Sequence, residues 1–220
     1  MKRVVILGAS GHAKVVSFVL RLSGHQVVGF LDDDSALHGM EVMGLPVLGA
    51  NELAPRLDVD AAIVGIGDNP SRRMWYERLQ GWSIPLVNAI HPSALIAQGV
   101  ALGQGTAVLG NVSINVEAQV GSNVILNTGA IVGHDCTVAS HVHVGPGVIL
   151  CGGVRVGEGA FLGAGAVVIP EQEIGEGSVI GAGTVVISSI PAGVVAVGNP
   201  ARILRPVGTF NRTSLRRGGA

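Results

Sequence analysis

The pair His134-Asp135 holds the side chains in this sequence that are best suited to proton transfer. A neutral imidazole can accept a proton near pH 7, and an adjacent carboxylate can orient the ring and make it more basic. Gly152 follows 18 residues after His134. Its backbone N–H is unobstructed by a side chain, as stabilisation of an anionic oxygen requires. These residues predict general-base chemistry, provided that the fold brings them together.

His141 and His143 follow closely, and the three histidines leave other interpretations open. Imidazoles are common zinc ligands, so the cluster is also typical of a metal site. Alternatively, His134 is an ordinary exposed histidine without a role. The two cysteines, Cys136 and Cys151, have neither metal-site spacing nor a disulfide framework, and we expect reduced thiols.

A strict six-residue repeat must position these side chains. Every sixth residue from Ile90 to Val186 is Ile, Leu or Val, very often followed directly by glycine. This period predicts a parallel β-helix of five to six coils, in which three hexads, or about 18 residues, form one coil. The aliphatic residues should point inward, and we expect the following glycine to occupy the corner with a positive φ. His134 then points outward at a corner, one coil from Gly152.

Residues 1–86 predict a different architecture, in which strands and helices alternate around a small parallel sheet of Rossmann type. We expect helices after His12 to about Leu22 and from Pro70 to about Leu79. The expected strands are Lys2–Leu7, Gln26–Leu31, Ala61–Ile66 and Pro85–Asn88. The predicted divisions are therefore 1–86 for the α/β domain, 87–205 for the β-helix with a C-terminal cap formed around residues 198–202, and 206–220 for a tail.

Three loops should meet at the carboxyl edge of this sheet, the usual ligand-binding edge in such folds. Gly8-x-x-Gly11 opens a helix whose N-terminus could hold a phosphate, although a tight turn without a ligand remains an alternative. It lacks the full G-x-G-x-x-G pattern, which disfavours a dinucleotide. Asp32 and Asp33 could bind ribose or a base, or simply be solvated, and Asp68-Asn69 ends the third strand.

The composition narrows the classes of partner. Lys and Arg number 14 against 15 Asp and Glu, so nothing in the charge indicates nucleic acid or an acidic membrane surface. The mean hydropathy is +0.52, but polar residues and glycines interrupt every apolar run before it could span a membrane. The N-terminus MKRVVILGASGH leads directly into a strand, so we expect no signal peptide and a cytoplasmic protein.

Several motifs together resemble one family over about residues 3–205. The chain is similar to bacterial left-handed β-helix sugar acyltransferases of the sialic acid O-acetyltransferase type, and most of all to nucleotide-sugar N-acetyltransferases that act on amino-dideoxy and amino-trideoxy sugars. The motifs are Gly8-Ala-Ser-Gly-His12, Leu31-Asp-Asp33, Ile66-Gly-Asp-Asn69, Asn88-Ala-Ile-His-Pro-Ser93, Asn127-Thr-Gly129, Gly133-His-Asp-Cys136 and Gly198-Asn-Pro-Ala201.

The resemblance implies a role for each matching residue. His134 matches the catalytic base, Asp135 its acidic neighbour, and Gly152 the oxyanion-hole amide. The implied acetyl-CoA contacts are His143, Gly152, Ala164 and Ala182, and the implied nucleotide-sugar contacts are Ser10, Gly11, His12, Asp32, Asp33 and Gly67. The resemblance also implies a homotrimer with active sites between neighbouring β-helices, and it leaves open whether His141 is only a surface residue.

The implied activity is acetyl-CoA-dependent N-acetylation of a nucleotide-linked amino-deoxy sugar, by direct attack on the thioester and without a metal. One alternative is O-acetylation of sialic acid or another sugar. A second is the β-helix carbonic anhydrase, which gathers three histidines around zinc from two subunits. A non-enzymatic alternative is a structural trimer that only binds a nucleotide. The motifs leave UDP, GDP and dTDP, and the sugar, equally open.

Overall fold

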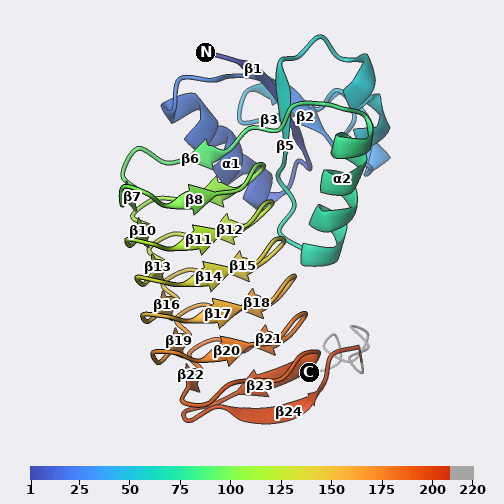
Figure 1. Cartoon of the computed structure of the whole chain (residues 1–220). Coiled ribbons are helices and arrows are strands. Elements are labelled where there is room, and N and C mark those ends of the chain that lie inside the picture. Colours follow the sequence, from blue (N-terminus) through green and yellow to red (C-terminus); the bar gives the residue numbers. More distant parts are fainter. Residues whose placement is uncertain (209–220) are drawn as a thin grey trace.

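The computed structural model describes residues 1–208, which form a small α/β unit at one end of a long β-helix (Figure 1). The unit contains a parallel sheet of strand order β2-β1-β5 and a short hairpin of β3 and β4. Its elements are β1 (Arg3–Leu7), α1 (Gly11–Leu22), β2 (Gln26–Leu31), the 3₁₀ helix η1 (Ser35–Leu37), β3 (Glu41–Val42), β4 (Leu45–Pro46), the 3₁₀ helix η2 (Asn51–Arg56), β5 (Ala61–Val64) and α2 (Asn69–Gly81).

The apolar runs of this unit become its buried strands. Every residue of β5 is buried, and so is every residue of β1 after Arg3, as expected for parallel strands that are covered on both faces. Helix α2 begins where expected, because the Asp68 side chain accepts a hydrogen bond from the Ser71 N–H and Pro70 occupies the first turn. The predicted α/β arrangement of three parallel strands is therefore confirmed.

The predicted fourth strand at Pro85–Asn88 is wrong. This segment forms only an isolated parallel bridge between Leu86 and Ala62. Pro85 has no N–H to donate, and the chain enters the first coil of the β-helix at Ala89, so a longer ladder has no room to form.

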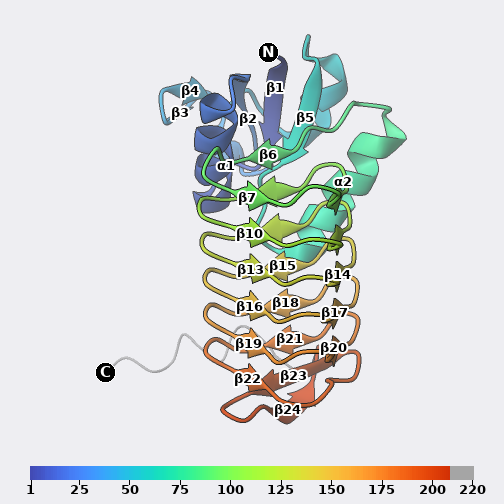
Figure 2. The same cartoon turned by 60° about the vertical axis from the view of Figure 1, so that its left-hand side comes forward.

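Residues 89–186 wind into a parallel β-helix with three flat faces, named here after one outward residue each (Figure 2). The Ile131 face contains β7 (Leu95–Ile96), β10 (Ser113–Ile114), β13 (Ile131–Val132), β16 (Ile149–Leu150), β19 (Val167–Val168) and β22 (Val185–Val186). The Arg155 face contains β8 (Ala101–Leu102), β11 (Gln119–Val120), β14 (Thr137–Val138), β17 (Arg155–Val156) and β20 (Glu173–Ile174). The His143 face contains β6 (Ala89–Ile90), β9 (Ala107–Val108), β12 (Ile125–Leu126), β15 (His143–Val144), β18 (Phe161–Leu162), β21 (Val179–Ile180), β23 (Val194–Val197) and β24 (Arg202–Pro206).

The six-residue repeat sets the register of these faces. Ile131 pairs with Ile149 and Val132 with Leu150, each 18 residues further along the chain. Val132 and Leu150 are fully buried and belong to one continuous core inside the helix. The predicted inward position of the aliphatic residues is confirmed.

The corner geometry differs from the prediction in one respect. Positive φ occurs two residues later than expected, as at Asp135 (φ 58°) and Gly153 (φ 70°). The glycine directly after the aliphatic residue is needed for another reason. A Cβ at Gly133 would lie 2.8 Å from the backbone carbon of Cys151 in the next coil. Successive coils approach so closely at this position that a side chain would clash.

Both ends of the β-helix are covered. Beyond the last coil, β23 and β24 pair antiparallel and close the end, where the sequence predicts a cap (Figure 1). The predicted tail from residue 206 begins inside β24, and its residues 209–220 lie outside the described part of the chain. The boundaries at 86/87 and 205/206 stay predictions. No helix within residues 1–208 is both long and apolar enough to cross a membrane.

A buried arginine joins the α/β unit to the β-helix. Arg72 of α2 is 1% exposed. Its guanidinium donates to the backbone oxygens of Gly67 (3.2 Å), Asn123 (3.1 Å) and His141 (2.8 Å). Burial lowers the pKa of Arg72 to about 10, which still leaves it charged at neutral pH. Because Asn123 and His141 lie on successive coils, this side chain fixes α2 against the β-helix.

The inward register predicts a large effect of a charge in the core. Leu150 is fully buried, so Leu150→Asp should place a carboxylate without a partner among aliphatic side chains, at a cost of about 3–5 kcal/mol. We expect loss of the cooperative thermal transition or aggregation during gel filtration. Arg155→Asp, on an outward position, should keep the parental melting temperature. A Leu150→Asp variant that is as heat-stable as the parent would contradict this register.

Candidate active site

His134 lies at the corner between β13 and β14, where the Ile131 and Arg155 faces meet. Its Nδ1 is 2.7 Å from the Asp135 Oδ2, and both side chains are mostly exposed, at 64% and 63%. The positive φ of Asp135 turns the chain at this corner. With Nδ1–H donating to the carboxylate, Nε2 is the nitrogen that is left to accept a proton.

The imidazole of His134 lies directly against Gly152 of the next coil. A Cβ at Gly152 would be 2.4 Å from both Nε2 and Cε1 of the ring, so only glycine accommodates the histidine in this position. The Gly152 N–H donates no hydrogen bond to any residue within 1–208. The structure therefore places the predicted base, its carboxylate partner and a free amide donor together. Pro170 and Glu171 complete a depression of about 360 Å³ around them.

A second pocket, of about 320 Å³, lies at the carboxyl edge of the parallel sheet. Ser10, Asp32 and Asp33 line it, as the sequence predicts, together with Asn51 and Met74. Ser10 precedes α1 without a side-chain hydrogen bond to the helix, so the first N–H groups of α1 remain available to an anion. This edge can therefore hold a phosphate next to a polar pocket.

The two aspartates of this pocket differ in what they can bind. Asp32 accepts the backbone N–H of Ala9 on one carboxylate oxygen (2.7 Å) and that of Asp34 on the other (2.9 Å). Asp33 accepts only the Asn51 N–H (3.1 Å), and its other oxygen has no hydrogen-bond partner among the described residues. Asp32 shapes the loops, whereas Asp33 keeps an oxygen available for a ligand.

His12, Gly67 and His143 meet where the α/β unit contacts the His143 face. The two imidazole centroids are 6.4 Å apart, and His143 Nδ1 is 3.3 Å from the Gly67 oxygen. Burial, followed by the charges of His143 and Arg72, lowers the pKa of His12 to about 3. Burial and then Arg72 lower the pKa of His143 to about 4. Both rings are therefore neutral at pH 7 and can act as hydrogen-bond groups but not as cations.

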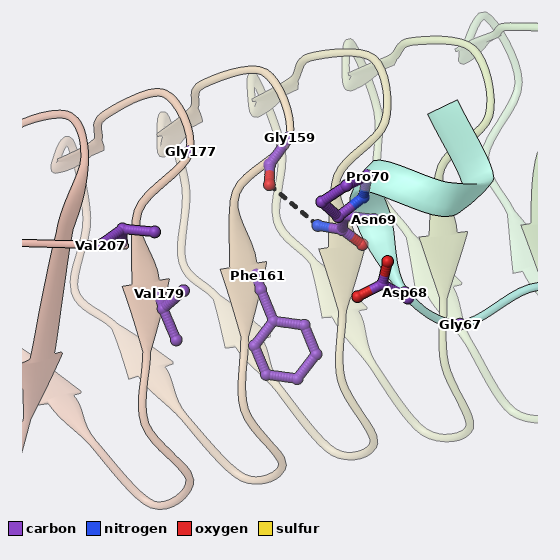
Figure 3. A pocket seen from close by; sticks show the side chains of 9 residues that line it. All are labelled: Gly67, Asp68, Asn69, Pro70, Gly159, Phe161, Gly177, Val179 and Val207. Atoms are coloured by element: carbon purple, nitrogen blue, oxygen red, sulfur yellow. Dashed lines mark hydrogen bonds between the residues drawn. The ribbon is translucent and has the colours of Figure 1, made fainter. Parts of the chain in front are cut away.

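A third cavity, of about 620 Å³, lies beside this cluster on the His143 face. Figure 3 shows Phe161 and Val179 projecting from β18 and β21 beneath the start of α2, where Asn69 donates to the Gly159 oxygen (2.9 Å). Gly67 lines this cavity rather than the pocket of Asp33. The cavity combines an apolar floor with a polar helix start, which suits a long amphipathic ligand.

The remaining predicted residues, Ala164 and Ala182, occupy equivalent exposed corners one coil apart. They lie where the His143 face meets the Ile131 face, which is a different edge from that of His134. Within one chain, the depression at His134 and the pocket at Asp33 share no lining residue. A single chain thus carries all parts of the predicted site but does not bring them together.

The structure answers the open question of whether His141 is a surface residue, because its side chain is buried. It is 7% exposed, its Nδ1 is 2.8 Å from the Asn123 side-chain amide nitrogen, and Tyr76 of α2 packs edge-on against its ring at 5.4 Å. The three histidines of the sequence cluster lie on a corner, beneath a helix and on a face. No group of three or more potential metal ligands gathers anywhere in residues 1–208.

Solved structures of known enzymes share this fold. PerB from Caulobacter crescentus, crystallised with CoA and GDP-perosamine, is 45% identical over 91% of this chain and 96% of its own, with a TM-score of 0.87. The acetyltransferase domain of PglB from Neisseria gonorrhoeae FA1090, in complex with acetyl coenzyme A, is 33% identical over 92% of this chain and 98% of its own, also with a TM-score of 0.87. This chain belongs to the nucleotide-sugar N-acetyltransferases with a left-handed β-helix.

Comparisons of the sequence agree with this family. The PglD N-terminal domain matches residues 3–79 and the bacterial transferase hexapeptide repeat matches residues 153–188. A UDP-N-acetylbacillosamine N-acetyltransferase from Bacillus subtilis (strain 168) is 36% identical over 112 residues, and this match spans about half of either chain. The predicted fold class and family are confirmed.

Some residues around the sites of this N-acetyltransferase gave no signal in the sequence. Asn51 follows the hairpin of β3 and β4 and reaches the sheet edge from outside the strand-loop-helix pattern. Phe161 occupies an outward hexad position, and only its aromatic character among mostly small or aliphatic neighbours could have marked it. Arg72 is one of several arginines in a polar helix, so its burial depends on the β-helix it contacts.

Gly11 provides a test of the phosphate site at the start of α1, next to the pocket of Asp33. No heavy atom lies within 4 Å of a Cβ built there, so Gly11→Val should fold normally. The valine should nevertheless obstruct the approach of a phosphate to the start of α1. We expect the KM for the sugar nucleotide to rise about tenfold or more, equivalent to ~1.4 kcal/mol, with the KM for acetyl-CoA nearly unchanged. Loss of CoA binding instead would show that this edge binds CoA rather than the sugar nucleotide.

Proposed function

We propose that this protein transfers the acetyl group of acetyl-CoA to the amino group of a nucleotide-linked amino-deoxy sugar, with His134 as the general base. One observation carries the proposal, which is the imidazole that Asp135 holds against the free N–H of Gly152. The relative that shares 45% identity binds CoA and GDP-perosamine, an amino sugar linked to a nucleotide, which supports the same pair of substrates here.

The chemistry follows from these groups. The sugar amine attacks the thioester carbon, and Nε2 of His134 removes the proton from the attacking nitrogen. The carbonyl oxygen becomes an oxyanion, which the Gly152 N–H stabilises by a hydrogen bond. The tetrahedral intermediate then expels the CoA thiolate, which takes up the proton held by His134, and the amide product remains. No covalent enzyme intermediate forms, so neither cysteine acts as a nucleophile.

The other sites bind the two substrates. The start of α1 and the pocket of Asp33 hold the nucleoside diphosphate. The neutral His12, in the first turn of α1 beside His143, can donate a hydrogen bond to the same ligand or accept one from it. The cavity floored by Phe161 and Val179, next to His143, suits the pantetheine arm of acetyl-CoA. Its apolar floor matches the methylene groups of that arm, while Asn69 can pair with its amides.

Thiol release from acetyl-CoA tests this function. Purified protein should release free CoA only when a nucleotide-linked 4-amino sugar is present, and mass spectrometry should detect the N-acetylated sugar. The matched sugar with a hydroxyl in place of the amine should give little or no turnover. Turnover of the hydroxyl sugar alone would indicate O-acetylation. Absence of turnover with a full panel of amino sugars would leave only a nucleotide-binding scaffold.

An apolar stripe on the Ile131 face supports assembly into a homotrimer. Its outward residues include Leu95, Ile131 and Ile149, which are 71%, 38% and 36% exposed in the single chain. The outward positions of the Arg155 face are polar instead, as at Thr137 and Arg155. The stripe is interrupted at Ser113 and continues beyond Ile149 with the half-buried Val167 and Val185. An exposed apolar surface of this kind marks an interface.

The edges of the Ile131 face explain why a trimer would complete the active site. His134 lies along one edge of this face, and Ala164 and Ala182 lie along the other. When three parallel β-helices pack with these faces toward a three-fold axis, each His134 edge meets the opposite edge of a neighbour. Acetyl-CoA would then lie between two subunits, next to the base.

A charge in the stripe should dissociate the trimer. Ile149→Asp puts a carboxylate into the proposed interface, and we expect smaller particles by light scattering with the loss of most acetyl transfer. Thr137→Asp places the same charge on the Arg155 face and should leave the particle size and the acetyl transfer unchanged. Complementation gives a further check, because mixed trimers of Gly11→Val and His134→Asn subunits should regain activity. A monomeric parent, or full activity of dissociated Ile149→Asp, would contradict the shared site.

A further inference from the structure

The pocket of Asp33 contains a buried amide without a partner. Asn51 is 2% exposed, and its side-chain Oδ1 is buried with no hydrogen bond to any described residue. Most buried polar atoms in folded proteins are hydrogen-bonded, so such an exception calls for a physical reason. Because Asn51 lines a pocket of about 320 Å³, a bound ligand can supply the missing donor.

Asp33 stands next to this amide as a second acceptor. The Asn51 N–H donates to Asp33 Oδ1 at 3.1 Å, which fixes the carboxylate relative to the asparagine. The other oxygen of Asp33 accepts no hydrogen bond from the described residues, in contrast to Asp32, whose two oxygens both accept backbone N–H groups. Asp33 and Asn51 therefore form a short row in the lining of the pocket, each with an oxygen that accepts no hydrogen bond from the described residues.

The chemistry of the nucleobases decides which of them fits this row. Guanine carries three N–H hydrogens on one edge, one on N1 and two on N2. Uracil and thymine have a single N–H between two carbonyl oxygens, which would face the carboxylate and be repelled. Ile66 and Met74, which line the same pocket, offer apolar surface for a flat ring. A planar carboxylate can accept two parallel N–H donors at once.

We propose that Asp33 and Asn51 bind the N1–N2 edge of guanine and make this enzyme selective for a GDP-linked sugar. Asp33 accepts from N1–H and one N2 hydrogen, and Asn51 Oδ1 accepts from the second. This inference rests on the proposed function, because it names the nucleotide carried by the sugar that accepts the acetyl group. The related proteins include one crystallised with GDP-perosamine and one named for a UDP-linked sugar, so the base has to be specified by individual residues.

Binding of free nucleoside diphosphates tests the assignment without acetyl transfer. By calorimetry, the parent should bind GDP about 10- to 100-fold more tightly than UDP, dTDP or xanthosine diphosphate, the range expected of a good bidentate contact. Asp33→Asn should weaken GDP by a similar factor and strengthen xanthosine diphosphate. Xanthine has a carbonyl in place of the guanine amino group, and the new amide can donate to it.

Two variants serve as comparison. Asp34→Asn removes the same charge from the same acidic run but outside the pocket, and it should leave GDP binding unchanged. Asn51→Leu keeps a similar volume without the acceptor and should weaken GDP about tenfold, with UDP nearly unaffected. Circular dichroism of each variant should match the parent, since Asp33 and Asn51 act on the ligand rather than on the fold.

Each other outcome overturns the proposal. If Asp33 binds the ribose hydroxyls, Asp33→Asn will weaken GDP and xanthosine diphosphate equally. Tighter binding of UDP or dTDP by the parent would likewise refute guanine selectivity. The proposed function is tested separately, because acetyl transfer to a UDP-linked sugar would keep it and refute the selectivity. Tight GDP binding without acetyl transfer to any GDP-linked amino sugar would keep the selectivity and refute the proposed function.

Discussion

Replacing His134 with asparagine should lower kcat by about 10²–10⁴, the usual effect of losing a general base. Asparagine keeps a polar side chain at the corner but cannot take a proton from the sugar amine. The side chain is 64% exposed and outside the core, so we expect an unchanged melting temperature. KM for both substrates should change little, because the proton moves only in the transition state. Steady-state kinetics with both substrates varied provides the measurement.

His141→Asn is the matched control, since it removes an imidazole from the same region of the β-helix. His141 contacts Asn123 and Tyr76 at the junction with α2 and does not line the depression of His134. We expect it to lower the melting temperature while kcat stays within severalfold of the parent. A crippled His141→Asn enzyme beside a near-normal His134→Asn enzyme would refute the assignment of the base.

Gly152→Ala should be almost as damaging as the loss of His134 itself. Gly152 does not have a positive φ, so alanine is acceptable to its backbone. The added methyl would nevertheless lie 2.4 Å from Nε2 and Cε1 of His134, and the ring would have to rotate away from Asp135. Both the base and the approach to the Gly152 N–H would be disturbed, and we expect kcat to fall by about 10²–10⁴.

Gly81→Ala, at the end of α2, is the control for the same change of residue type. Nothing lies within 4 Å of a Cβ at Gly81, and its φ is not positive, so kcat and stability should stay near the parental values. A crystal structure of Gly152→Ala should show the imidazole displaced. A fully active Gly152→Ala enzyme would mean that His134 works from a different position.

The sequence predicted most features that depend on the repeat, and few of the contacts that occur only once in the fold. An aliphatic residue at every sixth position specified the inward register of the β-helix, and that register brought His134 against Gly152 without further information. The strand-turn-helix pattern likewise located the edge that carries Ser10 and Asp33. Both inferences depend on local periodicity, which a single sequence displays directly.

The missing parts depend on contacts between segments that are far apart in the chain. The sequence left open whether His141 is a surface residue, because its burial depends on the packing of Tyr76 and Arg72 from α2. The glycine corner was misassigned because both a positive φ and a close approach of backbone favour glycine, and composition alone does not separate them. Asn51 reached the pocket through a hairpin whose position the pattern of strands did not specify.

The attachment of Arg72 to the corners of Asn123 and His141 has a consequence for how this chain could change in length. His134 occupies the coil between those two anchor points, so its height relative to the α/β unit is counted in whole coils of about 4.8 Å. An 18-residue duplication beyond Glu171 would lengthen only the far end. The same duplication between Ile90 and Asn111 would shift the coil that faces Arg72. A change in repeat number is therefore tolerable on one side of the coil of His134 and disruptive on the other.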